Sequence, residues 1–120
     1  MDLISTQELK EKLDRSPDDF KLVMVLGEWE YQAKHIPGSL RINTLEEGLE
    51  ALDPNDDIVI YDSGPACVAS RRAYRILRNY GYERVKCYAG GLEEWESAGH
   101  PLEGIGIRGV VSLSFRTTTY

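Results

Sequence analysis

Two side chains able to do chemistry, Asp62 and Cys67, lie close together in the stretch of residues 58–81. The apolar run IVIY at its start predicts a buried strand, and apolar side chains at helical spacing follow the loop. A loop between a strand and a helix N-terminus gathers backbone N–H groups and the positive end of the helix dipole, which favour an anion or a thiolate. We therefore expect either anion binding or nucleophilic catalysis by a cysteine in this loop.

Cys67 is the candidate catalytic residue because it is the only cysteine expected in the loop. It precedes the helix N-terminus, and Arg71 and Arg72 in the first turns could attract an anion towards it. The alternative is that Cys67 is a small buried residue in a loop without chemistry. Cys87, the second cysteine, falls in a later strand segment, where we expect a structural role.

Asp62 comes directly after the strand and allows two interpretations. It could act as a general base, or its carboxylate could accept hydrogen bonds from loop amides and fill the loop as a built-in anion. We prefer the second interpretation because a carboxylate held by several amides is unreactive. The expected anion-binding loop around Cys67 comprises Ser63, Gly64, Pro65, Ala66, Val68, Ala69, Ser70 and Arg71.

The histidines and the spacing of the arginines argue against other catalytic chemistries. His35 lies in a Pro-Gly turn that it is expected to brace, and His100 has no second ligand at metal spacing. No metal and no cofactor site is therefore predicted. A cysteine-phosphatase or arsenate-reductase loop needs an arginine six positions after its cysteine. Ala73 stands there, so this reaction class is disfavoured.

Strands and helices are expected to alternate along the chain and so to position the loop. Ser5 and Glu8 form a capping-box pattern for a first helix that ends near residue 14. The alternation predicts an α/β fold, with an open, mainly parallel sheet covered by helices on both faces. The remaining expected segments are strands at residues 20–26, 40–42, 58–61 and 84–88 and helices at 28–33, 45–52, 69–80 and 92–98.

Size and charge limit the class of protein. The chain has 120 residues, of which 42% are hydrophobic and 28% charged, and this suits one compact domain. Its net charge of −6 argues against broad binding to nucleic acid or to anionic membranes. The sequence contains no apolar run of membrane-spanning length and no signal-peptide pattern. Because two cysteines do not suggest a disulfide framework, we expect a cytoplasmic protein.

Residues 105–120 differ from the rest of the chain. Apolar side chains occupy most odd positions from 105 to 115, and small or polar side chains occupy most even ones. This period of two is typical of a β-strand or hairpin with one buried face. We hypothesise that this β-prone C-terminal tail pairs with the edge of its own sheet or with another protomer, which would form a homodimer.

Four sequence motifs in a fixed order resemble the rhodanese-like (sulfurtransferase) family. They are HIPGS at residues 35–39, the strand, loop and helix that begin at residue 58, GYERV at 81–85, and YAGGLEEWESAGHPL at 88–102. The resemblance covers about residues 3–102 and implies a rhodanese-like domain at residues 1–104, followed by the tail at 105–120. It also implies a central, mainly parallel sheet of about five strands with helices on both faces.

The resemblance implies a reaction, from which this chain departs at named positions. Active family members carry a cysteine directly after the central strand, and this cysteine takes sulfur from thiosulfate or another donor as a persulfide. Here Asp62 stands at that position, and Met24 and Leu26 stand where the family usually has an Asp-x-Arg pair. Cys67 and Ser70 match a second cysteine and a serine in a longer variant of the family's loop.

Two functions therefore remain open. The first is a module that lacks classical thiosulfate sulfurtransferase activity and serves in binding or regulation. The second is an atypical sulfurtransferase that carries a persulfide on Cys67. The expected partner is a small sulfur-containing anion or another protein, and the sequence leaves open whether the chain is an enzyme.

Overall fold

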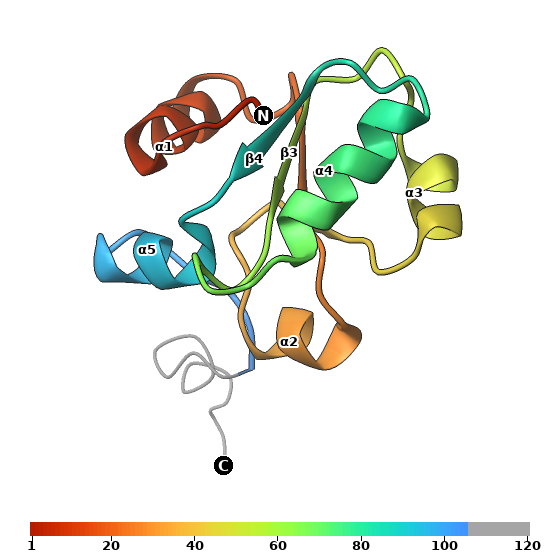
Figure 1. The fold of residues 1–120 in the computed structure, drawn as a ribbon. Coiled ribbons are helices and arrows are strands. Elements are labelled where there is room, and N and C mark those ends of the chain that lie inside the picture. The colour runs from red at the N-terminus through yellow and green to blue at the C-terminus, as the bar shows by residue number, and fades with distance from the viewer. Residues whose placement is uncertain (106–120) are drawn as a thin grey trace.

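The computed structural model describes residues 1–105, which form a four-stranded parallel sheet between helices (Figure 1). The strand order is β2-β1-β3-β4, so β3, which leads into the loop, has a neighbour on each side. The strands are β1 (Lys21–Met24), β2 (Leu40–Arg41), β3 (Ile58–Tyr61) and β4 (Val85–Tyr88). The helices are α1 (Thr6–Arg15), α2 (Glu28–Ala33), α3 (Leu45–Ala51), α4 (Ala69–Asn79) and α5 (Gly91–Ser97).

β3 is buried on both of its faces because each face of the sheet carries its own apolar cluster. Ile58 and Ile60 belong to one cluster together with Val23 of β1. Val59 and Tyr61 point the other way, into the second cluster. A parallel strand covered on both faces has a continuous apolar sequence, which is why the run IVIY predicts it without any alternation.

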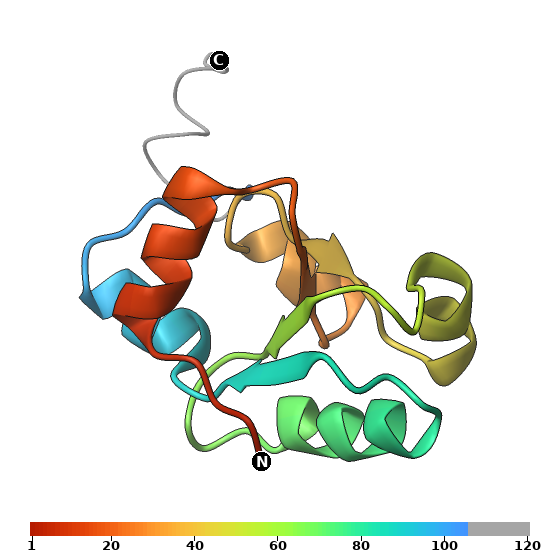
Figure 2. The same cartoon turned by 90° about the horizontal axis from the view of Figure 1, so that it is seen from above.

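The helices divide between the two faces of the sheet, as Figure 2 shows for α1 and α5 on one side and α4 on the other. Leu9 of α1 and Trp95 of α5 are buried in one cluster. Leu77 of α4 and Leu52, which ends α3, are buried in the other. The α/β fold with a parallel sheet and helices on both faces, predicted from the sequence, is therefore confirmed.

Within residues 1–105 the sheet has four strands, one fewer than the approximate five that the family resemblance implies, although a short segment occupies the fifth position. Leu3 forms an isolated parallel bridge with Cys87 of β4. The N–H of Ile4 donates to the carbonyl of Cys87 at 3.1 Å, and the N–H of Cys87 donates to the carbonyl of Asp2 at 2.8 Å. Residues 2–4 therefore extend the sheet at its β4 edge by a single bridge and not by a full strand.

Local hydrogen bonds fix the starts of two helices. The Ser5 hydroxyl accepts from the N–H of Glu8, and the Glu8 carboxylate accepts from the N–H of Ser5, so the predicted capping box is confirmed. This backbone hydrogen bond from Ser5 lowers the pKa of the Glu8 carboxyl. Thr44 and Glu47 form the same arrangement at the start of α3.

The end of the described chain lies against α2. The N–H of Ile105 donates to the carbonyl of Gln32 at 2.8 Å. Residues 106–120, and with them nearly all of the predicted β-prone tail, lie outside the described residues, so the pairing of the tail stays a prediction. Across residues 1–105, no helix combines the length and the apolar character that crossing a membrane requires.

Candidate functional site

The loop of residues 62–68 lies at the edge of the sheet where the parallel strands end. It connects β3 to the first residue of α4 and passes the turn that leads from β4 into α5 (Figure 1). In open α/β sheets, ligands bind at the carboxyl ends of the strands. The topology therefore places the stretch with Asp62 and Cys67 where such folds carry their sites.

The carboxylate of Asp62 is fully buried and accepts hydrogen bonds from two backbone N–H groups. Oδ1 accepts from Gly64 at 3.2 Å, within the loop. Oδ2 accepts from Ser70 at 2.8 Å, in the first turn of α4. Backbone donors that would otherwise be free to bind an anion at this helix start are therefore occupied by a side chain of the protein itself.

The N-terminus of α5 packs directly against the start of the loop. The carbonyl of Asp62 accepts from the N–H of Leu92 at 3.0 Å, and the carbonyl of Ser63 accepts from Glu93 at 2.9 Å. Gly91 has a positive φ of 63°, and a Cβ there would lie 2.5 Å from the carbonyl oxygen of Asp62 and 2.6 Å from the nitrogen of Gly64. Only glycine allows this approach, so the loop is held from outside as well as by its own hydrogen bonds.

Cys67 is half-buried and is not among the residues that donate to the Asp62 carboxylate. Its N–H donates to the carbonyl of Gly64 at 3.0 Å, which makes this amide unavailable to an anion. The Arg71 guanidinium donates to the carbonyls of Cys67, at 3.2 Å, and Pro65, at 3.4 Å. Arg71, which the sequence suggested as an anion attractor, is thus bound to loop carbonyls, and its cation stabilises the loop itself.

Cys87 lies behind the loop and contacts it through Ser70. The Cys87 thiol, which is fully buried, donates to the Ser70 hydroxyl at 3.4 Å. Burial raises the pKa of the Cys87 thiol, and the negative charge of Asp62 contributes in the same direction. The expected structural role agrees with this burial, but the sequence did not predict the contact with Ser70 because it joins residues 17 positions apart.

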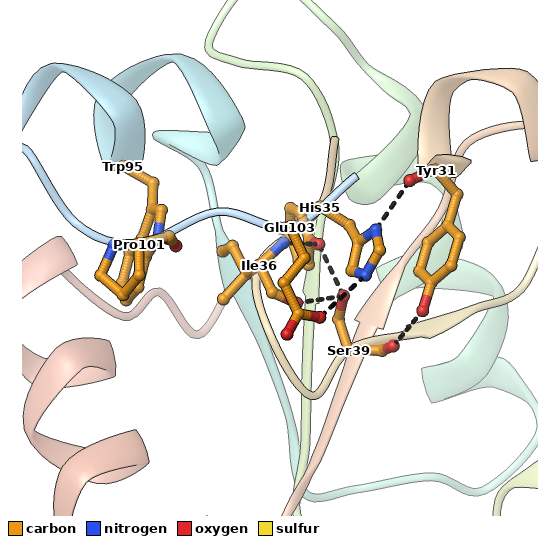
Figure 3. Close-up of polar contacts among 8 residues, drawn as sticks. Tyr31, His35, Ile36, Ser39, Trp95, Pro101 and Glu103 are labelled. Atoms are coloured by element: carbon orange, nitrogen blue, oxygen red, sulfur yellow. Dashed lines mark hydrogen bonds and ion pairs between the residues drawn. The ribbon is translucent and has the colours of Figure 1, made fainter. Parts of the chain in front are cut away.

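The HIPGS motif fixes the turn before β2 to the end of β3. The hydroxyl of Tyr61 accepts from the N–H of Ile36 at 3.0 Å and lies 2.9 Å from the Ser39 hydroxyl. Ser39 in turn donates to the carbonyl of Ile36 at 2.7 Å (Figure 3). Burial raises the pKa of Tyr61 to about 12. Tyr61, directly before Asp62, is therefore fixed by the strand pairing of its backbone and by the hydrogen bonds of its hydroxyl.

His35 braces the same turn and makes contacts that leave little of its ring free. The His35 Nδ1 lies 2.7 Å from the carbonyl oxygen of Tyr31, and the His35 and Tyr31 rings stack with centroids 3.9 Å apart. The His35 Nε2 lies 3.4 Å from the carboxylate of Glu103 (Figure 3). Backbone hydrogen bonds of 2.8 and 2.9 Å also join His35 to Glu103. The turn-bracing role expected for His35 agrees with these contacts. Among the described residues, no group of three or more His, Cys, Asp or Glu side chains could hold a metal ion.

Comparison with known proteins decides the family. The family description "Rhodanese-like domain" matches residues 5–98. This chain belongs to the rhodanese-like family. An HTH-type transcriptional regulator of Mycobacterium tuberculosis is 39% identical over 104 residues, which cover 85% of this chain and 45% of the regulator. Thiosulfate/3-mercaptopyruvate sulfurtransferase 2 of Arabidopsis thaliana is 30% identical over 95 residues, covering 62% of this chain and 28% of that enzyme.

Solved structures agree with the family and the fold. The rhodanese-like domain of the Anabaena protein Alr3790 aligns with a TM-score of 0.80 and 27% identity, covering 88% of this chain and 81% of that chain. The BH2092 protein of Bacillus halodurans aligns with a TM-score of 0.80 and 25% identity, covering 88% of this chain and 78% of that chain. The chain spans less than half the length of the curated relatives given above.

The rhodanese-like domain of this chain has apolar side chains at the end of β1 and two residues beyond it, where the family resemblance implies an Asp-x-Arg pair. Met24 is fully buried in the cluster that also contains Tyr61. Leu26 is partly buried and packs against the same cluster. Neither side chain can donate to or accept from an anion near the loop, so these positions contribute packing only.

Proposed function

We propose that this rhodanese-like domain lacks classical thiosulfate sulfurtransferase activity and acts as a binding or regulatory module. The observation that carries the proposal is the Asp62 carboxylate, buried and hydrogen-bonded to the N–H groups of Gly64 and Ser70. It stands where the resemblance implies the sulfur-carrying cysteine. A carboxylate cannot carry a persulfide, and its charge would repel an anionic sulfur donor.

Two further observations support a non-catalytic role. The positions implied to be polar are occupied by Met24, at the end of β1, and by Leu26, just beyond it, so residues at the ends of two strands of the sheet depart from the active pattern together. The relative that is 39% identical carries the name of an HTH-type transcriptional regulator. That name supports a regulatory role for a rhodanese-like module such as this one.

The second candidate function is an atypical sulfurtransferase that uses Cys67. It is favoured by the partial exposure of Cys67 in the loop and by the sulfurtransferases among the relatives. In this reaction the Cys67 thiolate attacks the outer sulfur of thiosulfate, and the S–S bond of the donor breaks. Sulfite leaves with the bonding electron pair, and the resulting persulfide passes its outer sulfur to cyanide or another nucleophile.

Thiosulfate-to-cyanide transfer, followed by intact-protein mass spectrometry, tests the two functions against each other. For the wild-type protein we expect no thiocyanate above the protein-free rate and no mass increase of one sulfur atom. Wild-type turnover that is lost in Cys67→Ser, with a persulfide located on Cys67, would overturn the proposal in favour of the second function.

An Asp62→Cys variant asks whether the scaffold still supports sulfur transfer once a thiol stands at the family's position. We expect this variant to gain a persulfide after thiosulfate treatment. Asp62→Ser is the matched control, because it also removes the carboxylate but provides no thiol. A persulfide in both variants would mean that removal of the Asp62 charge is sufficient for the sulfur donor to react with Cys67.

The partner and the assembly belong to the same proposal. We infer that the module binds a protein or a small sulfur-containing anion, acts in the cytoplasm, and forms a homodimer through residues 105–120. Light scattering on the full chain and on a chain that ends at residue 104 tests the assembly. The same monomeric mass for both chains would contradict the dimer.

A further inference from the structure

A second candidate site lies between α3, α4 and the sheet, on the face that carries the Ile58–Ile60 cluster. It is a cavity of about 270 Å³ that is partly open to solvent. Figures 1 and 2 show α3 and α4 as the helices that flank this region. Neither Gly64 nor Ser70, whose N–H groups bind the Asp62 carboxylate, lines the cavity, so it is a site distinct from the one described above.

Most residues that line the cavity are aliphatic, and the polar ones are Asn43, Thr44 and Arg72. Val23 and Ile60 form its floor on the sheet, and Ala73 and Ile76 of α4 line one side. Gly48 of α3 lines the opposite side, and a Cβ there would meet its nearest neighbour, Ile42, at an ordinary distance of 3.6 Å. Small residues on the facing helices therefore leave a volume that larger side chains could fill.

The size of the cavity suits a small organic molecule. A protein cavity of about 150 Å³ lined by Leu, Ile and Phe stays dry and binds benzene. The volume of about 270 Å³ here accommodates a benzene-sized body with a short substituent. Since most of the lining side chains are aliphatic, an apolar body would be favoured against them.

The charged residue among those that line the cavity is Arg72. It is exposed, and within residues 1–105 its side chain makes no hydrogen bond or ion pair. The neighbouring Arg71 differs, because loop carbonyls bind its guanidinium. The carboxylate of Glu47, at the start of α3, has other partners than Arg72: it accepts from the N–H groups of Asn43 and Thr44 and pairs with Arg41.

We propose that this cavity binds a small carboxylate with an apolar body, with the body between α3 and α4 and the carboxylate at Arg72. The proposal joins the mostly aliphatic walls to the available guanidinium, which suits carboxylate geometry. Ala69 also lines the cavity, and the next residue, Ser70, donates its N–H to Asp62. A ligand would therefore contact the helical turn that holds the loop.

Phenylacetate and its neutral isostere phenylacetamide are the probes, added to the full chain and followed by amide ¹H–¹⁵N NMR. We expect saturable shifts for both probes, concentrated at residues 42–48 and 69–77, with tighter binding of phenylacetate. In Arg72→Gln the affinity for phenylacetate should fall by up to about fivefold, the range of an exposed ion pair, while phenylacetamide is unaffected. Arg75→Gln, on the same helix but outside the cavity lining, is the control and should match the wild type.

A cavity-filling variant tests the position of the apolar body. Ala73→Leu should weaken binding of both probes, and its amide spectrum reports whether the fold is kept. If this variant does not fold, Arg72→Gln still decides the case. The proposal is overturned if neither probe gives saturable shifts in the wild type, if the shifts cluster elsewhere, or if Arg75→Gln weakens phenylacetate as much as Arg72→Gln.

Discussion

The buried carboxylate of Asp62 accepts a hydrogen bond from the backbone N–H of Ser70, at 2.8 Å and across eight positions of the chain. This contact joins the end of β3 to the first turn of α4. The Ser70 hydroxyl in turn accepts from the Cys87 thiol of β4, so three elements meet at Ser70. The Asp62 side chain is thus part of the packing of the domain, at the position where the resemblance implies the sulfur-carrying cysteine.

We expect Asp62→Ala to lower the free energy of unfolding by about 2 to 4 kcal/mol, because it leaves the N–H groups of Gly64 and Ser70 without their partner. Asp62→Asn, which keeps one carboxamide oxygen as an acceptor, should lose less. Urea denaturation of the three proteins measures the difference. If Asp62→Ala has the same free energy of unfolding as the wild type, water or a loop rearrangement must satisfy the N–H groups of Gly64 and Ser70.

The two thiols should differ in reactivity. Cys67 is partly exposed, whereas Cys87 is fully buried and its pKa is raised by that burial. We expect a thiol reagent such as DTNB to modify one cysteine rapidly in the native protein and both in urea. Cys67→Ser should abolish the rapid phase. A rapid phase that survives this substitution would place the reactive thiol at Cys87 and contradict its burial.

Gly91→Ala should destabilise the loop far more than an ordinary glycine substitution. Both Gly91 and Gly99 have positive φ, of 63° and 80°, but a Cβ at Gly99 would meet nothing within 4 Å. Gly99→Ala is therefore the matched control and should cost about 1 to 2 kcal/mol, the conformational term alone. Gly91→Ala adds the clash with Asp62 and Gly64, so its thermal midpoint should be clearly lower. Equal midpoints would show that α5 can move away from the loop without cost.

Tyr61 should make the domain sensitive to alkaline pH. Burial raises its pKa from 10.0 to about 12, so the native state keeps the phenol proton that the unfolded state releases. The stabilisation is complete below pH 10 and is lost as the pH rises towards 12, by up to about 3 kcal/mol. Tyr61→Phe should remove the contribution of Tyr61 and leave those of Tyr31, Cys87 and Tyr88, whose pKa values burial also raises. Urea midpoints of both proteins between pH 9 and 11.5 measure the contribution of Tyr61, and parallel declines would contradict the assignment to Tyr61.

The parts of the fold that depend on neighbouring residues could be predicted from the sequence. The capping box of Ser5 and Glu8 needs only a four-residue pattern, and the strand of residues 58–61 needs only a continuous apolar run. The turn-bracing role expected for His35 has the same origin, because its contact with Tyr31 spans four positions. Such local signals were sufficient to give the order of strands and helices.

The contacts that define the candidate site depend on chain segments that are distant in sequence. The need for glycine at residue 91 comes from the approach of α5 to the loop, and Arg71 binds loop carbonyls whose direction only the folded loop sets. The cavity next to Arg72 depends on how α3 and α4 pack on the sheet. No spacing pattern in the sequence encodes these distances.

The bridge between Leu3 and Cys87 also affects how the domain can associate with other chains. It covers part of the β4 edge, where backbone groups would otherwise be open to a strand from a neighbouring molecule. The opposite edge is β2, which spans only Leu40 and Arg41, and Arg41 adds a charge there. Within the described residues, the sheet therefore offers short and partly charged edges, a property that protects parallel sheets against aggregation through their backbones.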